Sequence, residues 1–160
     1  MIRLIQVLVS IFLLSITIGC GMPSKPTDSM FAVGVDELKD VRVGEPFVIT
    51  GYVKNASKKS WDLSFGAGLF TYELYDKSGN IVKTDAEMLF WNNIGFSTNI
   101  GPSEVYRNNG EEHRSREFYQ YTIQNPGIYK VRTTGDFNVV DKDESYKFVI
   151  SSEFYEIEVN

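Results

Sequence analysis

Residues 70–82 read FTYELYDKSGNIV and carry the clearest structural signal in the chain. Between Phe70 and Tyr75, apolar and polar side chains alternate with the two-residue period of a β-strand that buries one face. The run DKSGN, residues 76–80, then supplies an aspartate that accepts hydrogen bonds and a glycine that adopts positive φ at low cost. An apolar pair, Ile81 and Val82, follows at once. The stretch therefore predicts a β-hairpin.

The alternation continues toward the N-terminus. Residues 47–54 predict a strand whose odd-numbered positions share one face. Residues 61–65 predict another strand, with Trp61, Leu63 and Phe65 on one face. The polar run NASKKS, residues 55–60, joins the two strands. We therefore expect these strands to form a second hairpin.

Turn chemistry also divides the C-terminal half. In Asn125-Pro126-Gly127, proline presets φ and glycine fits the third position of a type II turn. Tyr129 follows this turn where immunoglobulin-like sandwiches hold a tyrosine whose hydroxyl closes the corner. The polar run 141–145 leads into the last strands, in which every second residue is apolar. We expect their buried residues to be Tyr146, Phe148, Ile150, Tyr155, Ile157 and Val159.

These short alternating segments recur throughout the chain, and none keeps a helical period for three turns. We therefore predict an all-β fold, an immunoglobulin-like antiparallel β-sandwich of seven to eight strands, over residues 31–160. The 11 Phe, 9 Tyr and 2 Trp supply enough apolar surface for a core without cross-links.

Composition excludes several classes of function. The 160 residues include one cysteine and one histidine, so an internal disulfide or a zinc site made of Cys and His cannot form. The formal net charge of -5 argues against nucleic acid as a partner, because phosphate binding depends on Lys and Arg. We predict no metal and no cofactor.

The first twenty residues have the plan of a signal peptide. Arg3 gives a positive start, residues 4–18 are mostly apolar, and polarity rises after Cys20. The apolar run is somewhat shorter than a membrane-spanning helix requires, although a plain transmembrane anchor stays open as an alternative.

The end of this run, Ile16-Thr17-Ile18-Gly19-Cys20, resembles the bacterial lipoprotein lipobox. That resemblance implies cleavage after residue 19 and acylation of the Cys20 thiol. We therefore expect a signal peptide over residues 1–19, and a lipidated N-terminus with a flexible tether over residues 20–30. The protein would then be lipid-anchored on the extracytoplasmic face of the cell membrane.

Several segments together resemble the intracellular proteinase inhibitor (BsuPI-type) domain. The resemblance runs from about Phe47 to Val131 and rests on residues 53–57, 63–65, 70–82, 100–104 and 125–131. It implies a β-sandwich and, as one possible activity, inhibition of a protease by a presented loop.

Catalytic groups are scarce. His113 lies in the charged run 111–116, and no Gly-x-Ser-x-Gly motif provides a nucleophile for it. Glu111 and Glu112 are neighbours, which in a strand would point to opposite faces, whereas a glycosidase pair must face one bond. Residues 141–144 hold three carboxylates, which suit either a calcium ion or a plain polar turn. We predict that the protein is not an enzyme.

The most unusual stretch is MLFWNNIGF, residues 88–96. It is either a core-facing strand or an exposed loop. The loop is considered because aromatic side chains with amides are typical of recognition surfaces. The candidate binding loop consists of Phe90, Trp91, Asn92, Asn93 and Phe96. We expect a non-enzymatic module that binds a protein or cell-envelope component, or alternatively an inhibitor of an exported or membrane protease.

Overall fold

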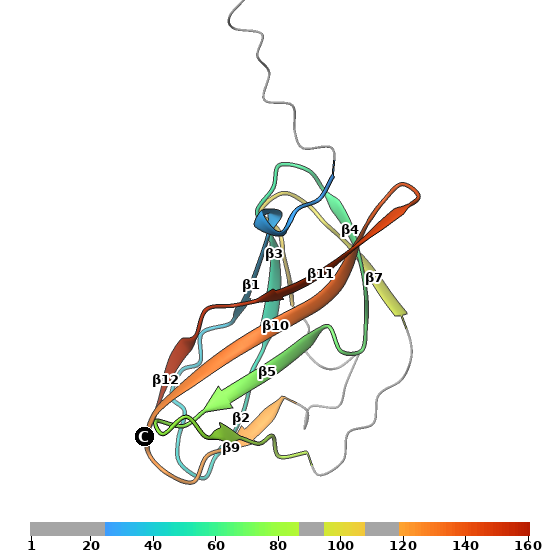
Figure 1. Ribbon diagram of the computed structural model, residues 1–160. Coiled ribbons are helices and arrows are strands. Elements are labelled where there is room, and N and C mark those ends of the chain that lie inside the picture. Colours follow the sequence, from blue (N-terminus) through green and yellow to red (C-terminus); the bar gives the residue numbers. More distant parts are fainter. Residues whose placement is uncertain (1–24, 87–94, 108–118) are drawn as a thin grey trace, which may run out of the picture.

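The computed structural model describes residues 25–86, 95–107 and 119–160, which form two layers of antiparallel strands (Figure 1). Within these residues one 3-10 helix, η2 (Asp28–Met30), precedes the strands. The strands are β1 (Phe31–Val35), β2 (Pro46–Val48), β3 (Gly51–Asn55), β4 (Trp61–Gly66), β5 (Phe70–Tyr75), β6 (Ile81–Val82), β7 (Gly95–Ile100), β8 (Val105–Arg107), β9 (Gln120–Thr122), β10 (Gly127–Asp141), β11 (Glu144–Ser151) and β12 (Tyr155–Val159).

The larger layer is built around β10, a strand of 15 residues. Along one edge β10 pairs first with β12 and then with β11. Along its other edge β10 pairs first with β5 and then with β4. The strands β6 and β7 extend this layer beyond β5 and β4. One strand therefore holds together both ends of the layer.

The smaller layer consists of β1, β3 and β8, with β2 and β9 pairing beside them. A backbone hydrogen bond of 3.0 Å, from Ile49 N–H to the carbonyl of Tyr119, extends the β2–β9 pairing toward β3. The two layers face each other, so the protein is an immunoglobulin-like antiparallel β-sandwich, as predicted. Eight of the described strands have five or more residues, and the other four have two or three.

Two clusters of buried side chains fill the space between the layers. One joins Phe31 and Val53 of the smaller layer to Leu63, Phe70 and Phe137 of the larger one. The other lies around Ile49, Leu74, Tyr121, Val131 and Ile157. The predicted inward positions of the last strands are confirmed. Phe148, Ile157 and Val159 are buried, while Glu156 and Glu158 are exposed. The other three predicted residues pack against the two clusters and are half-buried: Tyr146, Ile150 and Tyr155.

The hairpin predicted for residues 70–82 is confirmed, with Leu74 opposite Val82. The hairpin predicted between residues 47–54 and 61–65 is wrong. The strand β3 pairs with β1 and β8, whereas β4 pairs with β7 and β10. The polar run 55–60 therefore carries the chain from one layer to the other, although both strands bury the faces that their alternation predicts.

The predicted tyrosine corner is confirmed. The Tyr129 hydroxyl donates a hydrogen bond of 2.9 Å to the backbone carbonyl of Asn125. Gly127 between them has a φ of 146°, which a residue with a Cβ rarely adopts. The corner fixes the start of β10 and hence the position of Ile128 beside it.

Candidate binding surface

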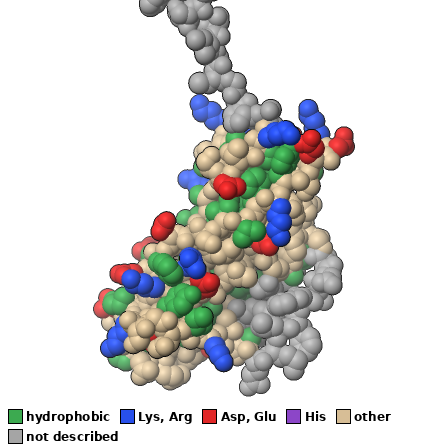
Figure 2. Space-filling model, viewed as in Figure 1, with side chains coloured by type: hydrophobic (Ala, Val, Ile, Leu, Met, Phe, Trp, Pro, Cys, Tyr) green, Lys and Arg blue, Asp and Glu red, His purple; other side chains and the backbone are tan. Residues whose placement is uncertain are grey.

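The outer face of the larger layer exposes apolar side chains where its strands begin and end. Ile81 is 65% exposed, Phe154 46% and Ile128 45%. The register places Tyr75 directly between Ile81 of β6 and Lys130 of β10. Figure 2 shows hydrophobic side chains on this face over β5, β10 and β12, with charged side chains among them. Residues far apart in the sequence thus form one exposed patch.

An aromatic pair lies at the centre of this patch. The rings of Tyr75 and Phe154 meet edge to face, with centroids 5.9 Å apart. The guanidinium carbon of Arg132 lies 5.0 Å from the centroid of the Phe154 ring, within cation–π range. Arg132 is itself held by Glu73, with 2.9 Å between Nε and Oε2. These contacts fix the orientation of Phe154 although half of its side chain is open to solvent.

A shallow depression of about 470 Å³ opens beside the aromatic pair. Its wall consists of Tyr75, Ile128 and Phe154, and its rim consists of Asp76, Lys77, Gly79 and Lys130. An apolar wall with a few polar groups at the rim is the usual composition of a binding site. We call this depression and its lining residues the Phe154 surface.

The rim of the Phe154 surface is shaped by a tight turn. The Asp76 carboxylate accepts hydrogen bonds from the backbone N–H groups of Ser78 and Asn80, each 2.8 Å long, and from the Asn80 side chain at 2.9 Å. These hydrogen bonds hold the pKa of Asp76 below its ordinary value, and the bond from the Asn80 side chain has the largest effect. Asp76 therefore keeps its negative charge beside Lys77, and the Lys130 ammonium lies 3.5 Å from Glu156, so the rim carries charges of both signs.

Most of the predicted binding loop lies outside the described residues, as do Cys20, Glu111, Glu112 and His113. The loop residues that lie outside are Phe90, Trp91, Asn92 and Asn93. Phe96 is described: it lies in β7, is half-buried and stacks on Phe65, with ring centroids 6.2 Å apart. The binding loop therefore stays a prediction. Phe96, its one described residue, packs at the edge of the core.

Two of the three carboxylates of the β10–β11 hairpin are engaged in ion pairs. Asp141 lies 3.1 Å from the Lys59 ammonium, and Glu144 lies 3.3 Å from that of Lys25. The Tyr146 hydroxyl also donates a hydrogen bond to Glu144. In the part of the chain that the structure describes, no three His, Cys, Asp or Glu side chains are grouped so as to hold a metal ion.

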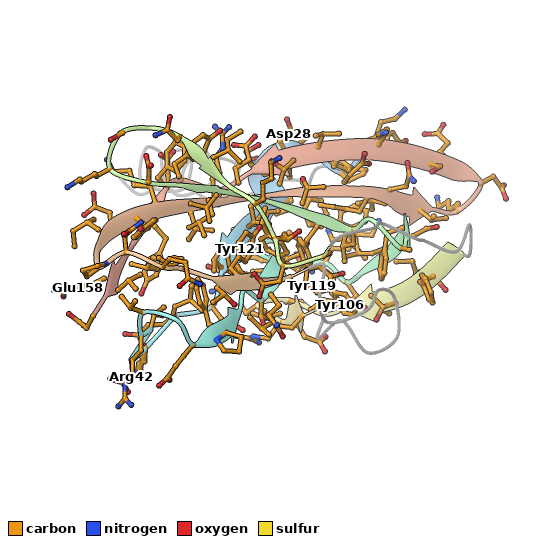
Figure 3. All side chains as sticks on the ribbon, turned by 90° about the horizontal axis from the view of Figure 1, so that it is seen from below. Asp28, Arg42, Tyr106, Tyr119, Tyr121 and Glu158 are labelled. Carbon is orange, nitrogen blue, oxygen red and sulfur yellow. The ribbon has the colours of Figure 1, made fainter. Side chains whose placement is uncertain are left out.

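A group of tyrosines lies between the layers. Figure 3 shows Tyr106, Tyr119 and Tyr121 near the middle of the molecule, away from Arg42 and Glu158 at its periphery. Burial raises the pKa of Tyr121 to about 12, and the charge of Asp85 acts in the same direction. The hydroxyl therefore stays neutral at physiological pH, as suits a residue buried in the core.

The Phe154 surface was missed by sequence reasoning. Its sequence signals are Ile128 and Tyr75, two apolar residues at positions that the alternation of their strands assigns to the face opposite the core. Phe154 lies in the short connection between two strands, where no period distinguishes a buried residue from an exposed one.

No protein-family model matches the chain, and no curated protein matches it. Solved structures with a similar arrangement of strands include the CARDB domain of the PF1109 protein from Pyrococcus furiosus, in complex with di-metal ions. It is 13% identical with a TM-score of 0.40, and the match covers 81% of this chain and 87% of that one.

Two further solved structures are similar at the same level. The native alpha-2-macroglobulin of Escherichia coli, in a structure that spans domain MG7 to the C-terminus, is 8% identical with a TM-score of 0.43, over 81% of this chain and 16% of that one. The ASH/PapD-like domain of human CEP192 is 11% identical with a TM-score of 0.34, over 81% and 86%. Similarity this distant assigns neither a ligand nor an activity to the chain.

Proposed function

We propose that this chain is an extracytoplasmic lipoprotein, anchored to the cell membrane by lipid on Cys20. Its β-sandwich acts as a non-enzymatic binding module for a protein or cell-envelope component. The observation that carries the binding role is the Phe154 surface, an exposed apolar depression whose central aromatic ring is held in place. Exposed apolar patches of this kind mark interaction sites in soluble domains.

The anchoring role is supported by the sequence around the only cysteine. Cys20 ends the apolar run and is preceded by a small residue, Gly19. An acyl group contributes about 0.8 kcal/mol for each methylene that enters the bilayer, and stable anchoring usually needs two chains. Within the described residues, no helix is long and apolar enough to cross a membrane.

The anchor is tested by the variant Cys20→Ala. We expect wild-type cells fed a labelled fatty acid to incorporate the label into the protein and to retain the protein in the membrane fraction. Cys20→Ala is expected to carry no label and to keep its leader, because the thiol is the only group that can receive the diacylglyceryl chain. Equal labelling of the two proteins would contradict acylation at Cys20.

The binding role is tested by photo-cross-linking in cells. A photoreactive residue replaces either Phe154, at the centre of the proposed surface, or Val149, which is 61% exposed on β11 and serves as the matched control. We expect a discrete cross-linked product from position 154 and none from position 149. For the captured partner, Phe154→Ala should weaken binding about tenfold or more, as for an interface hot spot.

Equal cross-linking from both positions would show that the Phe154 surface has no special role. A product whose partner is a protease would favour the alternative, inhibition of an exported or membrane protease, which stays a prediction. In a third protein the photoreactive residue replaces Trp91. A product from that position, with none from position 154, would instead support the loop at residues 90–96.

A further inference from the structure

The first described residues are already fixed to the body of the sandwich. The Lys25 ammonium pairs with Glu144 at 3.3 Å and lies 5.6 Å from the centroid of the Tyr146 ring. Pro26 and Met30 are buried, and the carbonyl of Met30 accepts a 2.8 Å hydrogen bond from the backbone of Ala56. The chain therefore packs on the domain before the predicted boundary at residue 31.

Four segments meet where the chain joins the domain. The segment 25–30 is tied to the β10–β11 hairpin by Lys25 and Glu144, and the run 55–60 is tied to the same hairpin by Lys59 and Asp141 at 3.1 Å. Backbone hydrogen bonds link Asn55 to Ser103 and Glu104, at 2.8 and 3.0 Å. We call residues 25–30, 55–60, 101–104 and 141–144 the proximal end. Figure 1 places η2 at this end and the C-terminus at the other.

The distance from this end to the proposed lipid is limited by chain length. Five peptide units separate Cys20 from Lys25. Fully extended, they span at most about 18 Å. A lipid-modified Cys20 would thus keep the proximal end within about 18 Å of the bilayer interface, which is too short a reach for the domain to turn over freely.

We propose that the proximal end faces the lipid bilayer and that the Phe154 surface points away from it. This inference rests on the proposed acylation of Cys20, and it defines the surface that meets the membrane. A partner bound at the Phe154 surface would then be held out from the membrane and not against it.

The charges of the proximal end determine the kind of lipid surface that suits it. Cations and anions occur there in similar numbers, and two of the lysines are paired with carboxylates. The lysines are Lys25, Lys58, Lys59 and Lys142, and the acids are Asp28, Glu104, Asp141, Asp143 and Glu144. A balanced surface gains little from anionic lipid. The proximal end therefore needs no anionic lipid, and we commit to a neutral, zwitterionic bilayer surface, reached through the tether, as the surface that it meets.

The native lysines allow a direct test. The chain from Cys20 to Asn160 is coupled through its only thiol to a maleimide phospholipid in phosphatidylcholine vesicles, and amine acetylation at each lysine is measured by mass spectrometry. We expect Lys58 and Lys142, which are exposed at the proximal end, to lose reactivity several-fold relative to protein coupled to a soluble maleimide. Lys39 and Lys77, exposed elsewhere on the domain, should keep theirs.

A lengthened tether is the matched control. Twenty Gly and Ser residues inserted before Lys25 add a flexible segment whose r.m.s. end-to-end distance is about 25 Å. This longer tether should restore the reactivity of Lys58 and Lys142. Equal protection of all four lysines, or protection of none, would overturn the proposed orientation. Protection that appears only when phosphatidylglycerol is added would overturn the neutral surface.

The two proposals can fail separately. The lipid in this experiment is attached chemically, so the footprint reports orientation whether or not cells acylate Cys20. An unlabelled Cys20 in cells would remove the lipoprotein proposal, whereas an unprotected proximal end on vesicles would remove only the orientation.

Discussion

Replacing Asn55 with alanine is expected to lower the free energy of unfolding by about 3 kcal/mol. The Asn55 side chain is fully buried. Its Nδ2 donates to the carbonyls of Lys59 and Ile100 at 2.8 and 3.0 Å, and its Oδ1 accepts from the backbone and hydroxyl of Ser57. Alanine would leave a buried carbonyl without its partner and would release the chain where it crosses between layers.

Urea unfolding of the chain from residue 22 onward measures this loss. Asn99→Ala is the matched control, because the exposed Asn99 amide makes a hydrogen bond to Asp62 on the surface. The control should change stability by no more than about 0.5 kcal/mol. Equal stability of Asn55→Ala and wild type would show that the crossing does not depend on this amide.

Phe137→Ala is expected to destabilise the protein by about 3–5 kcal/mol. Phe137 is fully buried in β10. Its ring meets that of Phe31 edge to face at 5.5 Å and stacks on that of Phe148 at 5.7 Å. Phe31 belongs to the smaller layer, so the truncation would open a cavity between the layers as well as remove apolar area.

Val149→Ala is the control for this prediction. Val149 lies opposite Asp136 on the neighbouring strand and is 61% exposed. Its truncation leaves no cavity, so we expect a change within about 0.5 kcal/mol. A loss of similar size in the two variants would mean that residue 137 is not part of a close-packed core.

Local features of the fold were predictable from the sequence. The hairpin at residues 70–82, the corner at Tyr129 and the buried face of residues 61–65 all depend on periods or turns within a few residues. Strand partners depend on contacts across the whole chain. The wrong hairpin at residues 47–65 shows this difference, because Asn55 and its hydrogen bonds turn a plausible loop into a crossing between layers.

The Phe154 surface could not be predicted for the same reason. Tyr75, Ile128 and Phe154 come from three separate parts of the chain, and only the registers of β5, β10 and β12 bring them together. The loop predicted at residues 90–96, most of which lies outside the described residues, depends on apolar side chains that are consecutive in sequence. A surface assembled from separate strands gives no such signal.

The length of β10 has a consequence for how the domain opens. Residues at one end of this strand, such as Val131, belong to one buried cluster, and Phe137 and Val139 belong to the other. Unfolding of the region around either cluster would therefore unpair part of β10, on which the other cluster also depends. We therefore expect the sandwich to unfold as one cooperative unit, with the slowest-exchanging amide protons along the middle of this strand.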